Sequence, residues 1–330
     1  MLPTQRRRQA QRAALSTMPD MSAPHVPSSA PTTAAASAPA PQDQWVTAPR
    51  GRLFARRWAA TRPADGQTAR PPIVLFHDSL GCVELWRGFP AVLAAATGRD
   101  VIAYDRLGFG RSDARTDVLP LDFVEDEAHT ALPALRAQLG IDRYVALGHS
   151  VGGGMAAHCA AASAANASVQ QTGPGAHGDC EALVTIAAQA CVEERTRQGI
   201  RDARDQFLAH PAQMERLARY HGGDARKAHW VLNAWVDTWL SPAFAAWSLE
   251  ATLARVTCPV LALHGENDEY GSAEQPERIA RWAAGPAQVE LLPGLAHVPH
   301  REQPEAVAAR VARFLTELPQ APGASPRSDL

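Results

Sequence analysis

The sequence predicts an α/β fold in which helices cover both faces of a mostly parallel sheet. Short apolar runs, rich in β-branched residues, alternate along the chain with amphipathic stretches of helical length. Strands and helices that alternate in this way form parallel sheets, because each crossover helix returns the chain to the same end of the sheet. A G-x-S-x-G motif at residues 148–152 stands between one such run and the next helical stretch, a placement typical of a strand–turn–helix nucleophile site.

The strands are expected at four-residue runs that are too short and too β-branched for helices. These runs are Ile73–Phe76, Val101–Tyr104, Tyr144–Leu147, Leu183–Ile186, Val260–Leu263 and Val289–Leu292. The helices are expected between them, at Val83–Thr97, Phe123–Leu139, Val151–Ala165, Ala273–Ala284 and Pro304–Leu318. In the last of these stretches apolar residues recur every fourth position, which indicates one buried helical face.

One long stretch interrupts the alternation. Residues 191–253 contain no strand signal, only polar, helix-like sequence with four tryptophans. We expect this stretch to be a helical lid between two parts of the core, residues 45–190 and 254–318. Residues 166–180 are rich in Gly, Ser and Gln and are predicted to be a surface loop.

Both ends of the chain have the composition of disordered segments. Residues 1–44 are rich in Ala, Pro, Ser and Thr and show no apolar periodicity, and residues 319–330 are similar. An arginine cluster at residues 6–12 superficially resembles a targeting peptide, but an unstructured extension is the preferred interpretation.

Composition and charge narrow the classes of function. A formal net charge of −2 gives no reason to expect a nucleic-acid partner. No run approaches the roughly 18 apolar residues of a membrane span, so no membrane association is expected. The five cysteines are scattered and contain no C-x-x-C pair, which argues against a disulfide framework or a zinc site and favours a cytoplasmic location. The expected partner is a small-molecule substrate, and the oligomeric state is left open.

Ser150 is the predicted nucleophile. It is the central residue of Gly148-His149-Ser150-Val151-Gly152. The glycines allow strand and helix to approach closely, and the turn projects the hydroxyl at a helix N-terminus, where backbone N–H groups can receive an anion. A serine hydroxyl needs a neighbouring base to remove its proton.

His297 is the predicted base. It follows the last expected strand and precedes the last helix, a loop that lies at the carboxyl edge of a parallel sheet together with Ser150. His300 is the alternative, although its position favours packing against the following helix. His77 and His149 are not expected to approach the nucleophile from the far side.

Asp268 is the predicted acid that orients the base. It stands in His264-Gly-Glu-Asn-Asp268-Glu269, one strand before the histidine. A carboxylate there would fix the tautomer of His297 and stabilise its protonated form. Glu266 and Glu269 are the alternatives. The chain order Ser, acid, His is the one found in α/β-hydrolases.

Two backbone N–H groups are expected to form an oxyanion hole. One is that of Val151, which follows the nucleophile, and the other lies in the loop His77-Asp-Ser79-Leu80-Gly after an earlier strand. Ser79 is the favoured donor and Leu80 the alternative. Because a carboxylate would oppose an oxyanion, we expect the Asp78 side chain to point away and to pair with a nearby cation such as Arg87 or Arg106.

These motifs together resemble the α/β-hydrolase fold superfamily from about residue 45 to residue 318. The resemblance is carried by H-D-S-L-G (77–81), D-R-L-G-F-G-R-S-D (105–113), G-H-S-V-G-G (148–153), G-E-N-D (265–268) and H-V-P-H-R-E-Q-P-E (297–305). The chain is also similar to bacterial members with an H-E-G-L-G-S-type oxyanion loop, from which it departs at residues 78, 79 and 82. The resemblance implies a lid between the sixth and seventh strands and no cofactor.

The leading hypothesis is a serine hydrolase that cleaves a small carboxylic ester or lactone through an acyl-enzyme. The superfamily also contains enzymes that hydrolyse a carbon–carbon bond next to a ketone, which is the alternative within the enzyme class. A serine nucleophile argues against haloalkane dehalogenase or epoxide hydrolase chemistry of the usual kind. From a different class, the chain could be a ligand-binding protein with a hydrolase body and little turnover. The fold alone does not choose the substrate.

Overall fold

The computed structural model describes residues 39–61, 70–170 and 179–318. These residues form an eight-stranded sheet with the order β1-β2-β4-β3-β5-β6-β7-β8. The strands are β1 (Gln42–Ala48), β2 (Gly51–Trp58), β3 (Ile73–Phe76), β4 (Val101–Tyr104), β5 (Tyr144–His149), β6 (Cys180–Ile186), β7 (Val260–Gly265) and β8 (Ala287–Leu292). β3 to β8 are parallel to one another, whereas β2 is antiparallel to both β1 and β4. The predicted α/β fold is therefore confirmed.

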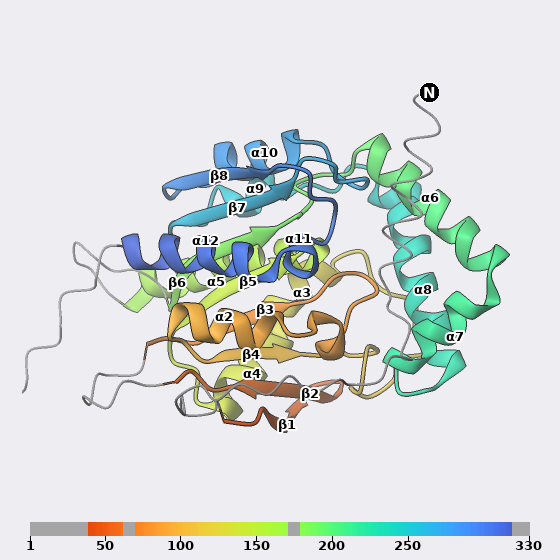
Figure 1. Cartoon of the computed structure of the whole chain (residues 1–330), viewed down its shortest axis with the longest axis horizontal. Helices are drawn as coiled ribbons and strands as arrows, with labels where there is room; N and C mark the ends of the chain where they lie inside the picture. The colour runs from red at the N-terminus through yellow and green to blue at the C-terminus, as the bar shows by residue number, and fades with distance from the viewer. Residues whose placement is uncertain (1–38, 62–69, 171–178, 319–330) are drawn as a thin grey trace, which may run out of the picture. The chain divides into compact units, whose positions relative to one another are not determined.

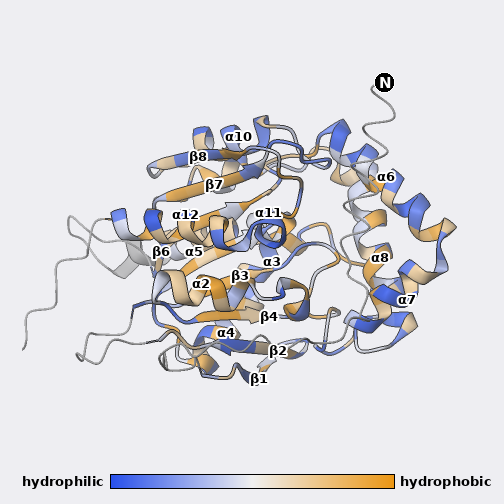
Figure 2. Ribbon diagram, in the orientation of Figure 1, coloured by the Kyte–Doolittle hydropathy of each residue, from blue (hydrophilic) through white to orange (hydrophobic). Residues whose placement is uncertain are grey.

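Alternate residues of the central strands enter two apolar layers, one on each face of the sheet. Ile73 and Leu75 pack with α2 (Phe89–Thr97) and α12 (Pro304–Glu317). Val74 and Phe76 point to the opposite face of the sheet, which is covered by α3 (Phe123–His129), α4 (Ala131–Leu139), α5 (Val151–Gln170) and, over β7 and β8, α10 (Glu274–Trp282). Figure 2 shows the apolar strands between helices whose outer faces are polar. This burial on both faces explains why the strands appear in the sequence as continuous apolar runs.

The first hairpin was not predicted. β1 begins at Gln42, so the expected disordered segment 1–44 extends too far, and the core starts before residue 45. Val46 is the only fully buried residue of β1, which leaves little periodic signal in an edge strand. Residues 1–38 and 319–330 of the predicted disordered ends lie outside the described residues.

Two predicted helices are divided. The stretch 83–97 becomes a 3₁₀ helix η1 (Val83–Trp86) followed by α2, because Pro90 would clash with the Trp86 carbonyl in a continuous helix. The stretch 123–139 breaks at Thr130, three residues before Pro133. α5 continues to Gln170 into the predicted loop 166–180, of which residues 171–178 lie outside the described part. A short helix α11 (Pro299–Glu302) was not predicted.

The segment 191–253 is helical, as predicted, apart from an isolated β-bridge between Cys191 and Ser248. It contains α6 (Glu194–Ala209), α7 (Pro211–Tyr220), α8 (Ala225–Leu240), η2 (Pro242–Phe244) and α9 (Glu250–Leu253), all between β6 and β7. Figure 1 shows α6, α7 and α8 beyond one end of the sheet. None of the helices in the described ranges has the length and apolarity needed to cross a membrane.

Candidate active site

Ser150 occupies a strained turn between β5 and α5. Its φ of 55° lies in the left-handed region that residues other than glycine rarely adopt. A Cβ at Gly148 would lie 2.0 Å from the carbonyl oxygen of Gly152, and a Cβ at Gly152 would lie 2.1 Å from that of Phe76. Both glycines of the motif are therefore required by the close approach of β3, β5 and α5. The turn places Ser150 directly before Val151, the first residue of α5.

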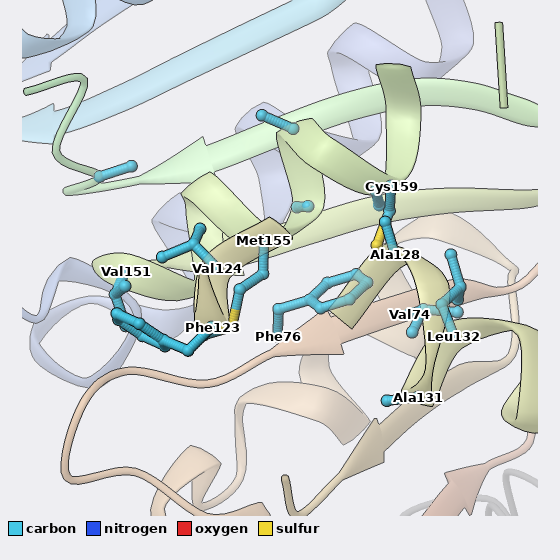
Figure 3. Packing of buried hydrophobic residues seen from close by; sticks show 14 of the residues in the cluster. Val74, Phe76, Phe123, Val124, Ala128, Ala131, Leu132, Val151, Met155 and Cys159 are labelled. Atoms are coloured by element: carbon cyan, nitrogen blue, oxygen red, sulfur yellow. The ribbon is translucent and has the colours of Figure 1, made fainter. Parts of the chain in front are cut away.

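The N-terminal part of α5 packs against the apolar layer on its face of the sheet. Figure 3 shows Met155 of α5 beside Phe76 of β3, with Phe123 and Val124 of α3 close by. All four of these side chains are buried and belong to one cluster with Val151. This packing fixes the start of α5, and with it the position of the nucleophile turn.

His297 and Asp268 meet at the carboxyl edge of the sheet. His297 Nδ1 lies 3.0 Å from Asp268 Oδ1 and 2.9 Å from Oδ2. The Asp268 carboxylate also accepts hydrogen bonds from the backbone N–H groups of Tyr270, at 2.7 Å, and Gly271, at 3.0 Å. These contacts hold the carboxylate toward His297 and leave Nε2 as the ring nitrogen that faces away from the acid.

The pair perturbs both pKa values. Burial alone would lower the pKa of His297, but the charge and hydrogen bond of Asp268 outweigh it and raise the pKa to about 9. Burial alone would raise the pKa of Asp268, but His297 and the surrounding donors hold it below its ordinary value. The acid is therefore ionised at neutral pH.

The alternative acids and the alternative base lie differently. Glu266 is exposed, and its Oε2 accepts the Gly294 N–H at 3.2 Å. Both carboxylate contacts to His297 Nδ1 come from Asp268 and neither comes from Glu269. Burial raises the pKa of Glu269. The His300 ring packs against Trp86, with centroids 4.8 Å apart, on the side of α2.

The Ser150 hydroxyl donates to Gln189 Oε1 at 3.3 Å. Gln189 is 2% exposed and follows β6 at the same carboxyl edge of the sheet. Gln189 was not among the predicted site residues. Its position three residues beyond a predicted strand, between the strands that lead to Ser150 and Asp268, was the available signal.

The predicted oxyanion loop follows β3. The Leu80 N–H donates to Asp78 Oδ1 at 3.1 Å, so this alternative donor is already engaged. The cation near the Asp78 carboxylate is Arg301, whose Nη2 lies 3.8 Å from Oδ2, so the two cations named as examples, Arg87 and Arg106, were wrong. The Asp78 side chain faces His149, whose Nδ1 lies 3.2 Å from Oδ2, because the turn directs the carboxylate inward under the loop. Arg106 reaches the Asp78 carbonyl instead, at 2.9 Å.

Arg87 and His221 form hydrogen bonds between the segments that follow β3 and β4 and the helical segment 191–253. Arg87 Nη2 donates to the Tyr220 hydroxyl at 3.0 Å. His221 Nδ1 accepts the Gly110 N–H at 2.8 Å, which leaves its Nε2 to donate to the Leu80 carbonyl at 3.3 Å. Burial lowers the pKa of His221 to about 4, in agreement with a neutral ring.

The site is nearly closed to solvent. Ser150 is 8% exposed and His297 is 9% exposed. On the side of the helical segment, the Tyr270 ring lies 4.7 Å from that of His297 and 6.0 Å from that of Trp235 in α8. A cavity of about 460 Å³, including its open mouth, is lined by Phe109 and other residues between the first hairpin and α3, and Ser150 does not line it.

Comparison with known proteins shows which family the chain resembles. The sequence model of the Alpha/beta hydrolase family matches residues 73–310. A (lyso)-N-acylphosphatidylethanolamine lipase from Bos taurus is 37% identical over 87 residues, which are 26% of this chain and 25% of the lipase. A 1-acylglycerol-3-phosphate O-acyltransferase ABHD5 from Sus scrofa is 37% identical over 86 residues, which are 26% of this chain and 24% of that protein. The chain thus spans about a quarter of the length of these curated relatives.

Solved structures share the fold over most of the chain. The enol-lactonase from Burkholderia xenovorans superposes with a TM-score of 0.57 and 21% identity, covering 83% of this chain and 100% of that one. The proline iminopeptidase from Mycobacterium smegmatis gives a TM-score of 0.58 and 23% identity, covering 84% and 98%. With the family match over more than half of its length, the chain belongs to the alpha/beta hydrolase family.

Proposed function

We propose that this protein is a serine hydrolase that cleaves a small carboxylic ester or lactone through an acyl-enzyme. The observation that carries the proposal is the conjunction of Ser150 at φ 55° with the buried His297–Asp268 pair at the same edge of the sheet. The strained turn presents the hydroxyl, and the pair supplies a base whose tautomer is fixed. The cleavage of lactones by the enol-lactonase is a property of that protein, and its fold-level similarity does not by itself extend to this chain.

In the proposed reaction Ser150 Oγ attacks the substrate carbonyl while His297 Nε2 takes its proton. The hydroxyl first turns from Gln189 toward His297. His297 then gives the proton to the leaving alcohol, and a water molecule that it activates releases the acid. Asp268 remains ionised and stabilises the imidazolium that forms in each half of the reaction.

The tetrahedral oxyanion is proposed to bind the N–H groups of Val151 and Ser79. Val151 is the first residue of α5, so its N–H has no acceptor within the helix. The positive end of the helix dipole favours an anion there. The engagement of the Leu80 N–H with Asp78 supports Ser79 as the second donor.

Ser79→Pro is expected to lower kcat by about 10²- to 10³-fold, the size associated with the loss of one oxyanion donor. Proline removes the backbone N–H and leaves the rest of the loop sequence unchanged. Ser79→Ala is the matched control, because it removes the hydroxyl and keeps the N–H. Steady-state kcat values of the two variants on one ester show which group is needed. Equal losses in both variants would show that the hydroxyl, rather than the backbone, is the working group.

The pH dependence of kcat/KM is expected to follow the ionisation of His297. A general base works only in its neutral form, and the pKa of His297 is raised to about 9. The rate should therefore rise with pH through neutrality and level off only on the alkaline side. A profile that is already flat at the ordinary histidine pKa of about 6.5 would contradict this assignment.

The helices of residues 191–253 are proposed to act as a lid. The low exposure of Ser150 and His297 means that a substrate reaches them only if this segment shifts. The contacts of His221 with Leu80 and of Trp235 with Tyr270 are those that such a movement would break.

The experiment that tests the proposed function combines p-nitrophenyl esters of graded acyl length, a set of lactones and a fluorophosphonate label. Hydrolysis together with labelling at Ser150 supports it. Labelling without ester or lactone turnover would favour carbon–carbon bond hydrolysis or ligand binding instead. Absence of both would refute a serine hydrolase.

A further inference from the structure

The His149 ring lies between the two loops that carry the proposed machinery. Its Nδ1 is 3.2 Å from Asp78 Oδ2 in the oxyanion loop. Its Nε2 is 2.8 Å from the backbone carbonyl oxygen of His297. His149 is 1% exposed and immediately precedes the nucleophile, so its position is fixed by β5. Both of its partners are hydrogen-bond acceptors.

Asp78 is also held by other residues of the loop 77–81 and by Arg106, so its contact with His149 affects the position of that loop. Its carboxylate accepts the Leu80 N–H, and its carbonyl oxygen accepts hydrogen bonds from His77 Nδ1 at 2.8 Å and from Arg106. The His77 tautomer is determined, because its Nε2 accepts the Arg106 N–H at 3.1 Å. A Cβ at Gly81 would lie 2.5 Å from Asp78 Oδ1, so the carboxylate fits under the loop only beside a glycine.

The Ser79 N–H lies between two residues that this carboxylate fixes. Asp78 and Leu80 flank it, and both are held by the Asp78 side chain. We propose that His149 is a positioning residue. Through its contacts with Asp78 and with the His297 carbonyl, it holds the Ser79 N–H and the His297 ring in the places that the reaction at Ser150 requires. This inference rests on the proposed function, since it concerns the donor and the base of that reaction.

The groups around the ring act on its charge in opposite directions. Asp78, with Arg301 3.8 Å from its Oδ2, lies on one side, and the rings of His297 and His300 lie 5.0 and 4.6 Å from that of His149. Burial lowers the pKa of His149, and the Asp78 carboxylate limits that fall. The bridge to both acceptors therefore requires the protonated ring, which the Asp78 carboxylate stabilises against the effect of burial, because a neutral ring donates to only one of them.

Two substitutions separate the two contacts. In asparagine the amide nitrogen is bonded to Cγ, as Nδ1 is in histidine, so His149→Asn keeps a donor toward Asp78 and loses the one toward His297. In glutamine the nitrogen is one bond farther out, so His149→Gln keeps the donor toward the His297 carbonyl and loses the one toward Asp78. Each variant is expected to lower kcat by about 10- to 100-fold with little change in KM, because misplacement of about 1 Å acts on the transition state.

Double variants that combine Asp78→Asn with each His149 substitution test the bridge most directly. With the amide oxygen held by the Leu80 N–H, as Oδ1 is now, asparagine places its NH2 group toward His149 Nδ1, so Asp78→Asn and His149→Gln disturb the same contact. Their losses should not multiply in the double variant, whereas those of Asp78→Asn and His149→Asn should come close to multiplying. Multiplicative losses in both double variants would overturn the proposed bridge.

His158→Gln is the matched control. It changes a histidine two turns along α5, whose Nε2 lies 3.3 Å from Thr252 Oγ1, and should leave kcat unchanged. Wild-type kcat and KM in folded His149→Asn and His149→Gln would overturn the inference. If neither variant folds, Asp78→Asn on its partly exposed loop carries the test: a reduced kcat with unchanged KM and thermal midpoint supports the inference, and an unchanged kcat overturns it.

Failure of the proposed function itself has a different signature. In that case the wild-type protein would turn over neither esters nor lactones, whether or not a fluorophosphonate labels it. A labelled, active wild type with fully active His149 variants refutes only the positioning role.

Discussion

Replacing Ser150 with alanine is expected to lower kcat by about 10³- to 10⁶-fold, as the removal of a triad nucleophile does elsewhere. The reason is that the remaining His297, Asp268 and oxyanion donors can bind and polarise a substrate but cannot form the acyl-enzyme. The thermal midpoint should not fall, because the strained φ of 55° is as accessible to alanine as to serine and the hydroxyl donates only to Gln189. Single-turnover and steady-state rates on the best ester measure the effect.

A fluorophosphonate provides the matching chemical test. It should label the wild-type protein at Ser150 and leave the alanine variant unlabelled, as peptide mapping by mass spectrometry would show. Persistent labelling of the variant, or a kcat within a few-fold of wild type, would refute Ser150 as the nucleophile.

Asp268→Asn should cost on the order of 10⁴ in kcat while the fold is kept. An amide can retain an oxygen toward the Tyr270 and Gly271 N–H groups, but it then presents an N–H to His297 Nδ1 and disfavours the tautomer whose Nε2 accepts the serine proton. Because the charge that raises the pKa of His297 is also removed, the pH profile of the residual activity should shift to lower pH.

Glu266→Gln is the control for this prediction, since Glu266 is exposed and contacts Gly294 rather than His297. It should change kcat little. Glu269→Gln tests the partly buried neighbour in the same way. A mild effect at Asp268 together with a large one at either glutamate would show that the acid has been assigned to the wrong residue.

Local pattern was enough to predict the parallel part of the sheet. Each predicted strand from Ile73 to Leu292 lies within an observed strand. Burial on both faces leaves a continuous apolar run in the central strands, whereas the edge strand β8 is largely exposed and was predicted from its β-branched and apolar residues alone. The first hairpin gave no such run, since β1 is an edge strand with one buried side chain. The helix breaks at Thr130 and before Pro90 could have been predicted from the nearby prolines, which exclude a continuous helix.

The candidate site could be predicted as far as its residues follow strand ends. Ser150, Asp268 and His297 each follow a parallel strand, and parallel strands bring their carboxyl ends to one edge. Gln189 follows the same rule and was missed because glutamine carries no recognised motif. The partner of Asp78 could not be obtained this way, because the pairing depends on the direction in which a buried side chain turns.

The sequence by itself determined the fold class, the turn that presents Ser150 and the identity of the residues that could serve it. Periodicity, glycine placement and chain order are properties of the sequence, so they can be recognised from the sequence alone. Only the tertiary structure decided that Asp268 rather than Glu266 faces His297, and that His149 bridges Asp78 and the His297 carbonyl. Such contacts join loops that are 29 to 148 residues apart along the chain, and their geometry is fixed by the packing of the whole sheet.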